Sequence, residues 1–439
     1  MVRQLNPQSD DAALTAFLQL SASQPAAFLH SGRHHSRWAK RSILAQPRAW
    51  FRHWASGKSE LLDAATLLPL PESKQLSHRL WRDLRWLLNE PSLAGKWIGT
   101  IGYEVNRFIE PERLPPHRGR ADDRGSPVVE LALCPAPTVY PAATSPAGAG
   151  GTGGAVSALP VAIAEKIGRS RADYEAAVAQ VLEYIGAGDV FQVNLAQRFT
   201  LPFVGNPREL YRRLAAISPA WYGAYLDLPP LQSNQPGRSL LCTSPELFLD
   251  VSDGHVITRP IKGTRPASAS ADELRASEKD AAELNMIVDL MRNDLGRVCD
   301  YGSVKVTEPR TIESHPTVHH GVATIEGQMH PSRDIVDLLR ATLPGGSVTG
   351  APKVRAMQII DELEPVARGP YCGVIGMLSR DEAVLNIAIR TCAISPVAAD
   401  THLADFWAGG GIVADSSPAA EYLETLDKAA AVWHALAGP

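Results

Sequence analysis

One lysine stands in a short segment that prolines and a glycine stiffen. The segment TRPIKGTRP places Lys262 after Pro260 and before Gly263. Proline fixes its own φ and lacks an N–H, so this segment is not a helix interior. A mobile surface lysine needs no such frame, whereas a lysine that must meet one atom of a substrate does. The pattern therefore marks Lys262 as a candidate for chemistry.

Glu246 is the carboxylate that could share a pocket with this lysine. It lies in the strand-like run SPELFLDV, 16 residues before Lys262. On adjacent strands the two side chains would either face one pocket or form an ordinary strand-to-strand ion pair. The pattern alone favours the ion pair.

Acidic side chains recur at helical spacing in two segments. In SEKDAAELNMIVDLMRNDLG, Asp280 and Glu283 are three residues apart and point to one side of the predicted helix. In SPAAEYLETLDKAAAVWHAL, Glu421, Glu424 and Lys428 share one face. Together the two helices could hold one hard divalent cation such as Mg²⁺, which prefers oxygen ligands. Each pair taken alone is more typical of a solvated helix face.

Two glycine-rich stretches could bind anions through backbone N–H groups. LPGGSVTGAPK is not a P-loop, because Ala351 and Pro352 separate its last glycine from Lys353. AGGGIVADS precedes the acidic C-terminal segment. Two anion cradles, two acidic helix faces and one framed lysine suit a small dianionic substrate bound with a metal.

The elements that must position these residues are of both kinds. The strand-like runs VFQVNLAQRFTL, SLLCTSPELFLDV, HVITRPI and LNIAIRTCAI alternate with helical segments at uneven intervals, which predicts an α+β fold. Residues 141–160 are rich in Ala, Gly, Pro, Ser and Thr, and they predict a linker or loop. Their G-x-G-x-x-G match lacks the strand and helix of a dinucleotide site. The linker separates an N-terminal region, 1–140, from a catalytic domain, 161–439.

Composition narrows the class of protein. The chain has 439 residues and a net charge of −4, which argues against a nucleic-acid partner. It has no apolar run of about 18 residues and no signal-peptide pattern at its N-terminus, so we expect no membrane span. Five widely spaced cysteines without a C-x-x-C pair indicate a reducing, cytoplasmic location.

In this order, the blocks resemble the chorismate-utilising enzymes. The resemblance covers about residues 165–435 and rests on DVFQVNLAQRF, SPELF, TRPIKGT, MIVDLMRNDLGRV, PGGSVTGAPKVRAMQIIDELEP, NIAIRT and GGGIVADSSPAAEYLETLDKA. Before the linker it is limited to FLHSG and IGYEVNRFIE. The resemblance implies two antiparallel sheets packed face to face with helices outside.

TRPIKGT distinguishes the branches of this family. Most relatives read PIAGT, with alanine in the place of Lys262, and the lysine form resembles the aminodeoxychorismate synthase branch. That branch implies that Lys262 adds at C2 of chorismate as the C4 hydroxyl leaves. Ammonia then adds at C4 and expels the lysine, giving 4-amino-4-deoxychorismate for p-aminobenzoate and folate synthesis. One alternative is anthranilate synthase component I, which Lys262 disfavours. The other is a catalytically dead module that senses chorismate or tryptophan, which the complete acidic set and the lysine disfavour.

The resemblance implies functional roles for the residues of this chain that stand at matching positions. The catalytic group is Lys262, Glu246, His320 and Thr349; the substrate-binding group is Arg390, Tyr371, Gly410, Gly411, Lys428 and Thr264; the Mg²⁺ group is Glu283, Glu421 and Glu424, with Asp280 beside them. The pocket wall departs from the family at two positions, Gly321 and Cys372.

The resemblance also implies partners. No cysteine here has the G-x-C-x-G context of a glutaminase nucleophile, so a separate glutaminase subunit is expected to supply ammonia. Relatives hold tryptophan in the N-terminal region, and only FLHSG points to such a site, so the sequence leaves tryptophan binding open.

Overall fold

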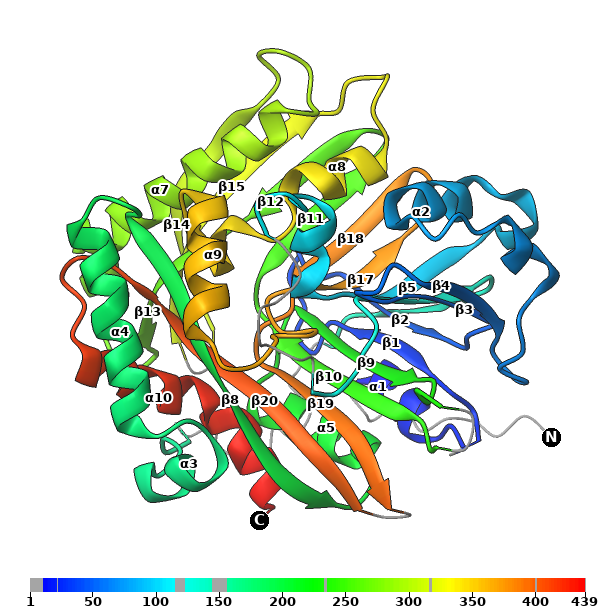
Figure 1. Cartoon of the computed structure of the whole chain (residues 1–439), viewed down its shortest axis with the longest axis horizontal. Helices are drawn as coiled ribbons and strands as arrows, with labels where there is room; N and C mark the ends of the chain where they lie inside the picture. The colour runs from blue at the N-terminus through cyan, green and yellow to red at the C-terminus, as the bar shows by residue number, and fades with distance from the viewer. Residues whose placement is uncertain are drawn as a thin grey trace.

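The chain forms an α+β structure built on two antiparallel sheets (Figure 1). The structure is a computed structural model, which describes residues 11–21, 23–114, 123–143, 156–232, 235–315, 318–398 and 401–438.

The first sheet has the strand order β16-β8-β20-β19-β10-β9-β1-β2-β7. Its strands are β1 (Ala27–His30), β2 (Arg41–Ala45), β7 (Thr138–Pro141), β8 (Gln192–Val204), β9 (Tyr222–Leu228), β10 (Arg238–Ser244), β16 (Gly350–Ala351), β19 (Thr391–Ala398) and β20 (Thr401–Ile412).

The second sheet has the order β13-β15-β12-β11-β18-β17-β5-β6-β3-β4, with β14 paired to β15. Its strands are β3 (Ala49–His53), β4 (Ser59–Asp63), β5 (Lys96–Ile101), β6 (Val129–Cys134), β11 (Leu247–Ser252), β12 (His255–Arg259), β13 (Ile261–Pro266), β14 (Lys305–Ser314), β15 (Val318–Gln328), β17 (Val374–Leu378) and β18 (Glu382–Ile387).

Helices cover the outer faces of the sheets (Figure 1). The α-helices are α1 (Ala12–Leu18), α2 (Leu80–Asn89), α3 (Val161–Ile167), α4 (Arg171–Gly186), α5 (Pro207–Ile217), α6 (Ala271–Ala276), α7 (Glu278–Gly296), α8 (Ile335–Thr342), α9 (Lys353–Leu363) and α10 (Pro418–Ala437); the 3₁₀ turns are η1 (Pro71–Gln75), η2 (Pro91–Leu93), η3 (Tyr103–Phe108) and η4 (Gly346–Val348). Helices α4, α9 and α10 pack on β8 and β20, and α7 packs on β13 and β15.

The N-terminal region shares both sheets with the rest of the chain. β1 pairs with β9, and β5 pairs with β17, so its strands continue the sheets that the later strands build. One apolar cluster joins the facing sides of the sheets and includes Ala27 and Leu226 from the first and Ile98 and Met377 from the second. This cluster shows that the sheets pack face to face. Most of the predicted linker, 144–155, lies outside the described residues.

Two runs that were predicted as single strands each form two strands, one in each sheet. SLLCTSPELFLDV divides into β10 and β11 at Pro245 and Glu246, and LNIAIRTCAI divides into β18 and β19 around Arg390. Pro245 has no N–H for a ladder, and Arg390 has a φ of 51°, outside the extended region. Reading each run as one strand was therefore wrong. The chain crosses between the sheets at Glu246 and again at Arg390.

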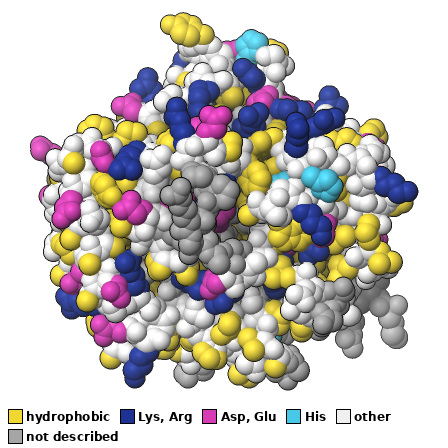
Figure 2. Space-filling model, in the orientation of Figure 1, with side chains coloured by type: hydrophobic (Ala, Val, Ile, Leu, Met, Phe, Trp, Pro, Cys, Tyr) yellow, Lys and Arg dark blue, Asp and Glu magenta, His cyan; other side chains and the backbone are white. Residues whose placement is uncertain are grey.

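The surface mixes charges of both signs. On the face shown in Figure 2, Lys and Arg are interspersed with Asp and Glu. Among the described residues, no helix combines the length and the apolar character needed to cross a membrane.

Candidate active site

Lys262 lies on a bulge of β13. The register with β15 runs from Ile261 opposite Val322 to Thr264 opposite His320, so β13 contains one residue more than its partner over this step. Gly263 takes a φ of +80°, which a side chain would disfavour. The Lys262 amine lies 3.4 Å from the place where a Cβ on Gly411 would be. The bulge thus directs the lysine toward the end of β20, in the first sheet.

The surroundings of Lys262 favour a neutral amine. Burial lowers the pKa of Lys262 below its ordinary value, although Glu283 opposes this effect, and the positive charge of Lys428 adds to it. Among the described residues, Lys262 and Glu246 do not form an ion pair within 4.0 Å. The strand-to-strand ion pair that the sequence pattern favoured is therefore not found.

Glu246 is a buried acid at the crossing from β10 to β11. It is 4% exposed, and its Oε1 accepts a hydrogen bond of 2.6 Å from Ser347 Oγ. Burial raises the pKa of Glu246 to about 7, against the opposing effects of Ser347 and the charge of Lys262. Glu246 can therefore both hold and release a proton near neutral pH.

His320 is a buried neutral imidazole beside the lysine strand. Its Nδ1 lies 2.9 Å from Thr264 Oγ1, and its Nε2 has no hydrogen-bond partner among the described residues. Burial lowers the pKa of His320 well below the usual range, and Arg390 adds to this effect. The Thr349 hydroxyl, in contrast, donates to the carbonyl of Gly345 at 3.0 Å. Thr349 thus closes its own turn and does not offer a free hydroxyl.

Arg390 and Tyr371 supply groups of the kind that bind a carboxylate. Arg390 Nη1 lies 3.5 Å from Ser218 Oγ, and burial lowers the pKa of Arg390. Tyr371 is buried, and its ring stacks on Trp407 at a centroid distance of 6.0 Å. A guanidinium with one long hydrogen bond keeps donors for a ligand.

The carboxylates of the predicted metal group approach one another from α7 and α10. Burial raises the pKa of Glu283, and Glu424 adds to this effect; burial likewise raises the pKa of Glu421, again with a contribution from Glu424. The Glu424 side chain is 49% exposed, so partial burial opposes its ionisation only weakly, and Lys428, whose Nζ is 2.6 Å away, lowers its pKa. Lys428 Nζ also donates to the carbonyl of Gly409 at 2.8 Å.

This carboxylate set fits a hard cation in its chemistry. Glu421 Oε2 is buried without a hydrogen-bond partner in the described part of the chain, and a Cβ on Gly410 would lie only 2.8 Å from it. Within the same residues, no three His, Cys, Asp or Glu side chains stand close enough to hold a metal ion as they are. The set therefore provides suitable donors that a cation would have to draw together, with Lys428 released from Glu424.

Asp280 has a different partner. Its Oδ2 accepts a hydrogen bond of 2.7 Å from Arg265, and its Cβ lies 2.9 Å from where a Cβ on Gly263 would be. Asp280 therefore supports the bulge that carries Lys262, and it does not point its carboxylate freely toward the other acids.

The two glycines of β20 differ in what they offer. Asn194, opposite Gly411, donates its N–H to Thr349 and accepts from Arg368 with its carbonyl, so both groups point away from β20. In an antiparallel ladder, the N–H of Gly411 then also points away from β8, whereas that of Gly410 pairs with Leu195. Of Gly410 and Gly411, it is therefore Gly411 whose N–H points away from the ladder with β8. Gly410 contributes space beside Glu421, which differs from the expectation for both amides.

Two polar residues of the site were not singled out from the sequence. Ser347 binds Glu246 as described, and it lies in the recognised PGGSVTG block. Gln192 is fully buried, and neither of its amide atoms has a hydrogen-bond partner among the described residues. Its Nε2 lies 2.2 Å from where a Cβ on Gly411 would be, which places the amide beside Lys262. The sequence feature that could have identified Gln192 is its place in DVFQVNLAQRF, one of the runs on which the family resemblance rests.

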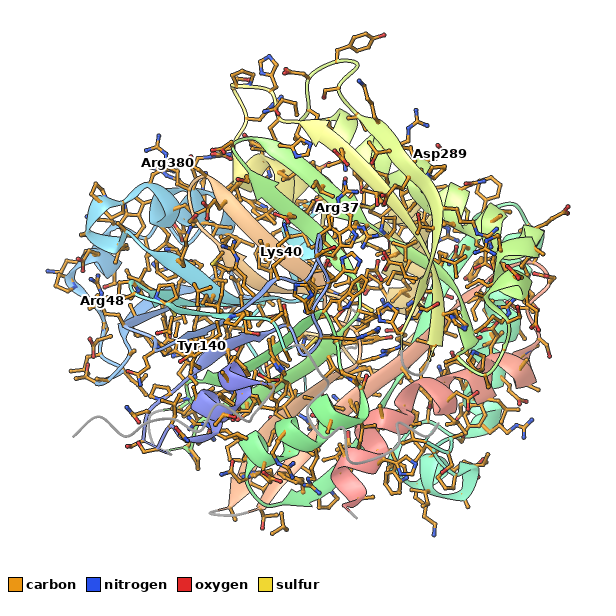
Figure 3. The ribbon with its side chains drawn as sticks, turned by 180° about the vertical axis from the view of Figure 1, so that it is seen from behind. Arg37, Lys40, Arg48, Tyr140, Asp289 and Arg380 are labelled. Carbon is orange, nitrogen blue, oxygen red and sulfur yellow. The ribbon has the colours of Figure 1, made fainter. Side chains whose placement is uncertain are left out.

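The FLHSG segment borders a separate cavity between the sheets. The cavity has a volume of about 400 Å³ and contains none of the predicted catalytic residues. It is lined by Ser31, Trp221, Tyr222 and Met377, among others. Arg37 and Lys40 also border it and lie near the middle of the rear view (Figure 3). The sequence left tryptophan binding open, and the lining of this cavity does not identify its ligand.

A family model described as chorismate binding enzyme matches residues 158–434. The chain is 38% identical to aminodeoxychorismate synthase component 1 of Klebsiella aerogenes, over 98% of each chain. It is 44% identical to an anthranilate synthase component 1 of Haloarcula marismortui over 58% of this chain, and that match spans 50% of the relative.

A solved structure has the same fold. The crystal structure of anthranilate synthase component I from Streptococcus pneumoniae aligns with a TM-score of 0.69 at 27% identity, over 98% of this chain and 100% of the other. The fold expected from the resemblance is confirmed.

Proposed function

This chain belongs to the family of chorismate-binding enzymes, and on that premise we propose that it converts chorismate and ammonia to 4-amino-4-deoxychorismate. The observation that carries the proposal is the combination of Lys262, whose pKa burial lowers, with Glu246, whose pKa is raised to about 7. A neutral amine can attack carbon, and a protonated carboxyl can assist a leaving hydroxyl.

In the first step the Lys262 amine forms a bond to C2 of chorismate. The two conjugated ring double bonds each shift by one bond, and the C4–oxygen bond breaks as Glu246 donates its proton, so that water leaves. His320, which stays neutral, has an unpartnered Nε2 that can hydrogen-bond a substrate hydroxyl. Ammonia then attacks C4, both double bonds shift back, and the C2–nitrogen bond breaks so that the Lys262 amine leaves while the surplus proton returns to Glu246. The net change is replacement of a hydroxyl by an amino group.

Binding of the substrate's two carboxylates is divided between two regions. Arg390 and Tyr371 would hold the enolpyruvyl carboxylate, since a guanidinium fork matches two oxygens. The N–H of Gly411 and the amine of Lys428, which donates to Gly409 from α10, would hold the ring carboxylate. Mg²⁺ held by Glu283, Glu421 and Glu424 would neutralise the ring carboxylate there.

We expect activity to require Mg²⁺, because the three glutamates would otherwise repel the substrate. Glu424→Gln should reduce turnover by at least about 10²-fold, the upper end of losses for outer-shell partners of metal sites, and leave the melting temperature near that of the wild type. Asp427→Asn, an exposed change on the same helix, is the matched control. Undiminished turnover in excess chelator would refute the metal assignment.

Ammonia must come from outside this chain. All five cysteines are buried, and burial raises the pKa of each thiol, to about 11 for Cys242 and to about 12 for Cys372, so none is poised as a glutaminase nucleophile. We propose that a separate glutaminase subunit supplies it.

We expect ammonium to support the reaction of the purified chain and glutamine not to support it. Adding a glutaminase subunit should make glutamine effective. Product formation from glutamine by the pure chain, with ammonium excluded, would contradict this expectation.

The product formed from chorismate distinguishes the proposed function from that of anthranilate synthase. The chain should turn chorismate, Mg²⁺ and ammonium into 4-amino-4-deoxychorismate, which a lyase converts to p-aminobenzoate. Anthranilate, which is strongly fluorescent without added lyase, would show that the alternative is correct.

A further inference from the structure

Gly321 lies directly opposite the bulge that carries Lys262. Between the pairs Ile261–Val322 and Thr264–His320, β13 has two residues, Lys262 and Gly263, whereas β15 has one, Gly321. A Cβ on Gly321 would stand 2.6 Å from the carbonyl oxygen of Lys262, and real Cβ atoms do not approach so closely. The next nearest atom outside the Lys262 carbonyl group is Arg310 Nε, at 3.9 Å. A side chain at position 321 would therefore clash with the backbone of Lys262 and, among the described residues, with no other group.

The other side of the bulge is equally confined. A Cβ on Gly263 would lie 2.9 Å from both Asp280 Cβ and Leu274 Cδ1. The peptide between Lys262 and Gly263 is thus held between β15 on one side and α6 and α7 on the other. A push on the Lys262 carbonyl has to rotate this peptide, and rotation changes the direction in which the Lys262 side chain leaves the strand.

We propose that Gly321 is a positioning residue whose missing side chain lets β15 meet the Lys262 carbonyl and so fixes the direction of the Lys262 side chain. Its effect on turnover rests on the proposed function, because only a lysine that attacks carbon needs such accuracy. A misplacement of about 1 Å can cost about 10²-fold in rate.

The test compares Gly321→Ala with Gly327→Ala, the same change in the same strand. A Cβ at position 327 would meet first the Cys299 Sγ, at 3.0 Å, and then a Val304 methyl, at 3.4 Å, and these side chains can shift. Gly321→Ala should fold, keep the wild-type KM for chorismate, and lose about 10²-fold in kcat with ammonium. Gly327→Ala should stay within about threefold of wild type, within the spread of mutational effects.

A double-mutant cycle separates positioning from general damage to the sheet. In a Lys262→Ala background, Gly321→Ala should change the residual rate by less than about twofold, since the group it positions is gone. Equal losses in both backgrounds, an equal loss from Gly327→Ala, or failure of Gly321→Ala alone to fold would each overturn the proposal.

A second readout does not depend on the reaction. The rate at which an amine reagent modifies Lys262 at one fixed pH, followed by peptide mass spectrometry, should change in Gly321→Ala and not in Gly327→Ala. An unchanged rate in Gly321→Ala would count against positioning. If Lys262→Ala itself kept full activity, the proposed function would fail while this labelling result still decided the role of Gly321.

Discussion

Lys262→Ala should lose formation of 4-amino-4-deoxychorismate by on the order of 10³-fold or more, as expected when a nucleophile is removed. It should still bind chorismate, because Arg390, Tyr371 and the glutamates of α7 and α10 are untouched. With the amine gone, ammonia or water can reach C2 directly, so small amounts of 2-amino or 2-hydroxy products are expected. Product chromatography and chorismate binding on both proteins measure these outcomes.

A structural lysine makes a different forecast. If Lys262 served only to stabilise the fold, its removal would lower the melting temperature and the affinity for chorismate together and leave the product unchanged. Wild-type rates of 4-amino-4-deoxychorismate formation by Lys262→Ala would exclude the covalent mechanism.

Glu246→Gln should reduce kcat by about 10²- to 10⁴-fold, the usual contribution of a general acid. The neutral amide keeps the shape of the side chain and can still accept from Ser347, so the fold should survive. The wild-type profile of kcat/KM against pH should have one limb with an apparent pKa of about 7. The profile of Glu246→Gln should lack this limb. Its kcat/KM should rise with pH to a plateau, because the fraction of Lys262 in the unprotonated form rises in the same way.

The same substitution should stabilise the protein at alkaline pH. The folded pKa of Glu246, about 7, exceeds the ordinary value of 4.5, so the folded state holds this proton more tightly than the unfolded state. Stability contributed by the group is full below pH 4.5 and is lost as pH rises toward 7. Above pH 7 the free energy of unfolding is lower by about 3 kcal/mol than below pH 4.5 because of this group. Denaturant unfolding at pH 5 and pH 8 should show this fall in the wild type and not in Glu246→Gln.

Ser347→Ala is the matched control for these two effects. It keeps the carboxyl but removes the hydrogen bond that favours its ionised form. The limb near pH 7 should therefore move to higher pH in Ser347→Ala. A profile unchanged in both variants would show that Glu246 does not titrate in the reaction.

Local signals in the sequence predicted several elements well. Ser170 is of a residue type favoured at helix N-caps, and it caps α4, with its Oγ accepting from the N–H of Asp173 at 3.1 Å. Ser417, followed by Pro418, is likewise a typical helix start, and it occupies the N-cap of α10 although its side chain makes no capping bond. Caps and periodicity depend on residues a few positions apart, so one sequence suffices to find them.

The crossing between the sheets could not be predicted in that way. SPELF and NIAIRT read as parts of continuous strands, because strand-favouring residues stand on both sides of Glu246 and Arg390, and Pro245 by itself does not show that the chain changes sheets. Their division depends on which distant strands pair with each half: β10 joins β9 and β19, while β11 joins β12 and β18. The family resemblance supplied these site residues, and periodicity alone would have left them inside strands.

Contacts within the site were also beyond the sequence. Nothing local indicates that Asp280 would pair with Arg265, or that Gln192 would be buried beside Gly411. Each contact joins segments that are distant in the sequence: the first joins α7 to β13, and the second joins β8 to β20.

The most direct test of the covalent mechanism is the mass of the protein after reaction with chorismate and Mg²⁺ in the absence of ammonia. We expect the mass to rise by that of chorismate less one water, with the addition on the peptide that contains Lys262. The adduct should be discharged by ammonium and should be absent from Lys262→Ala. An unmodified Lys262 at saturating chorismate, in a protein that forms 4-amino-4-deoxychorismate once ammonium is added, would contradict the account.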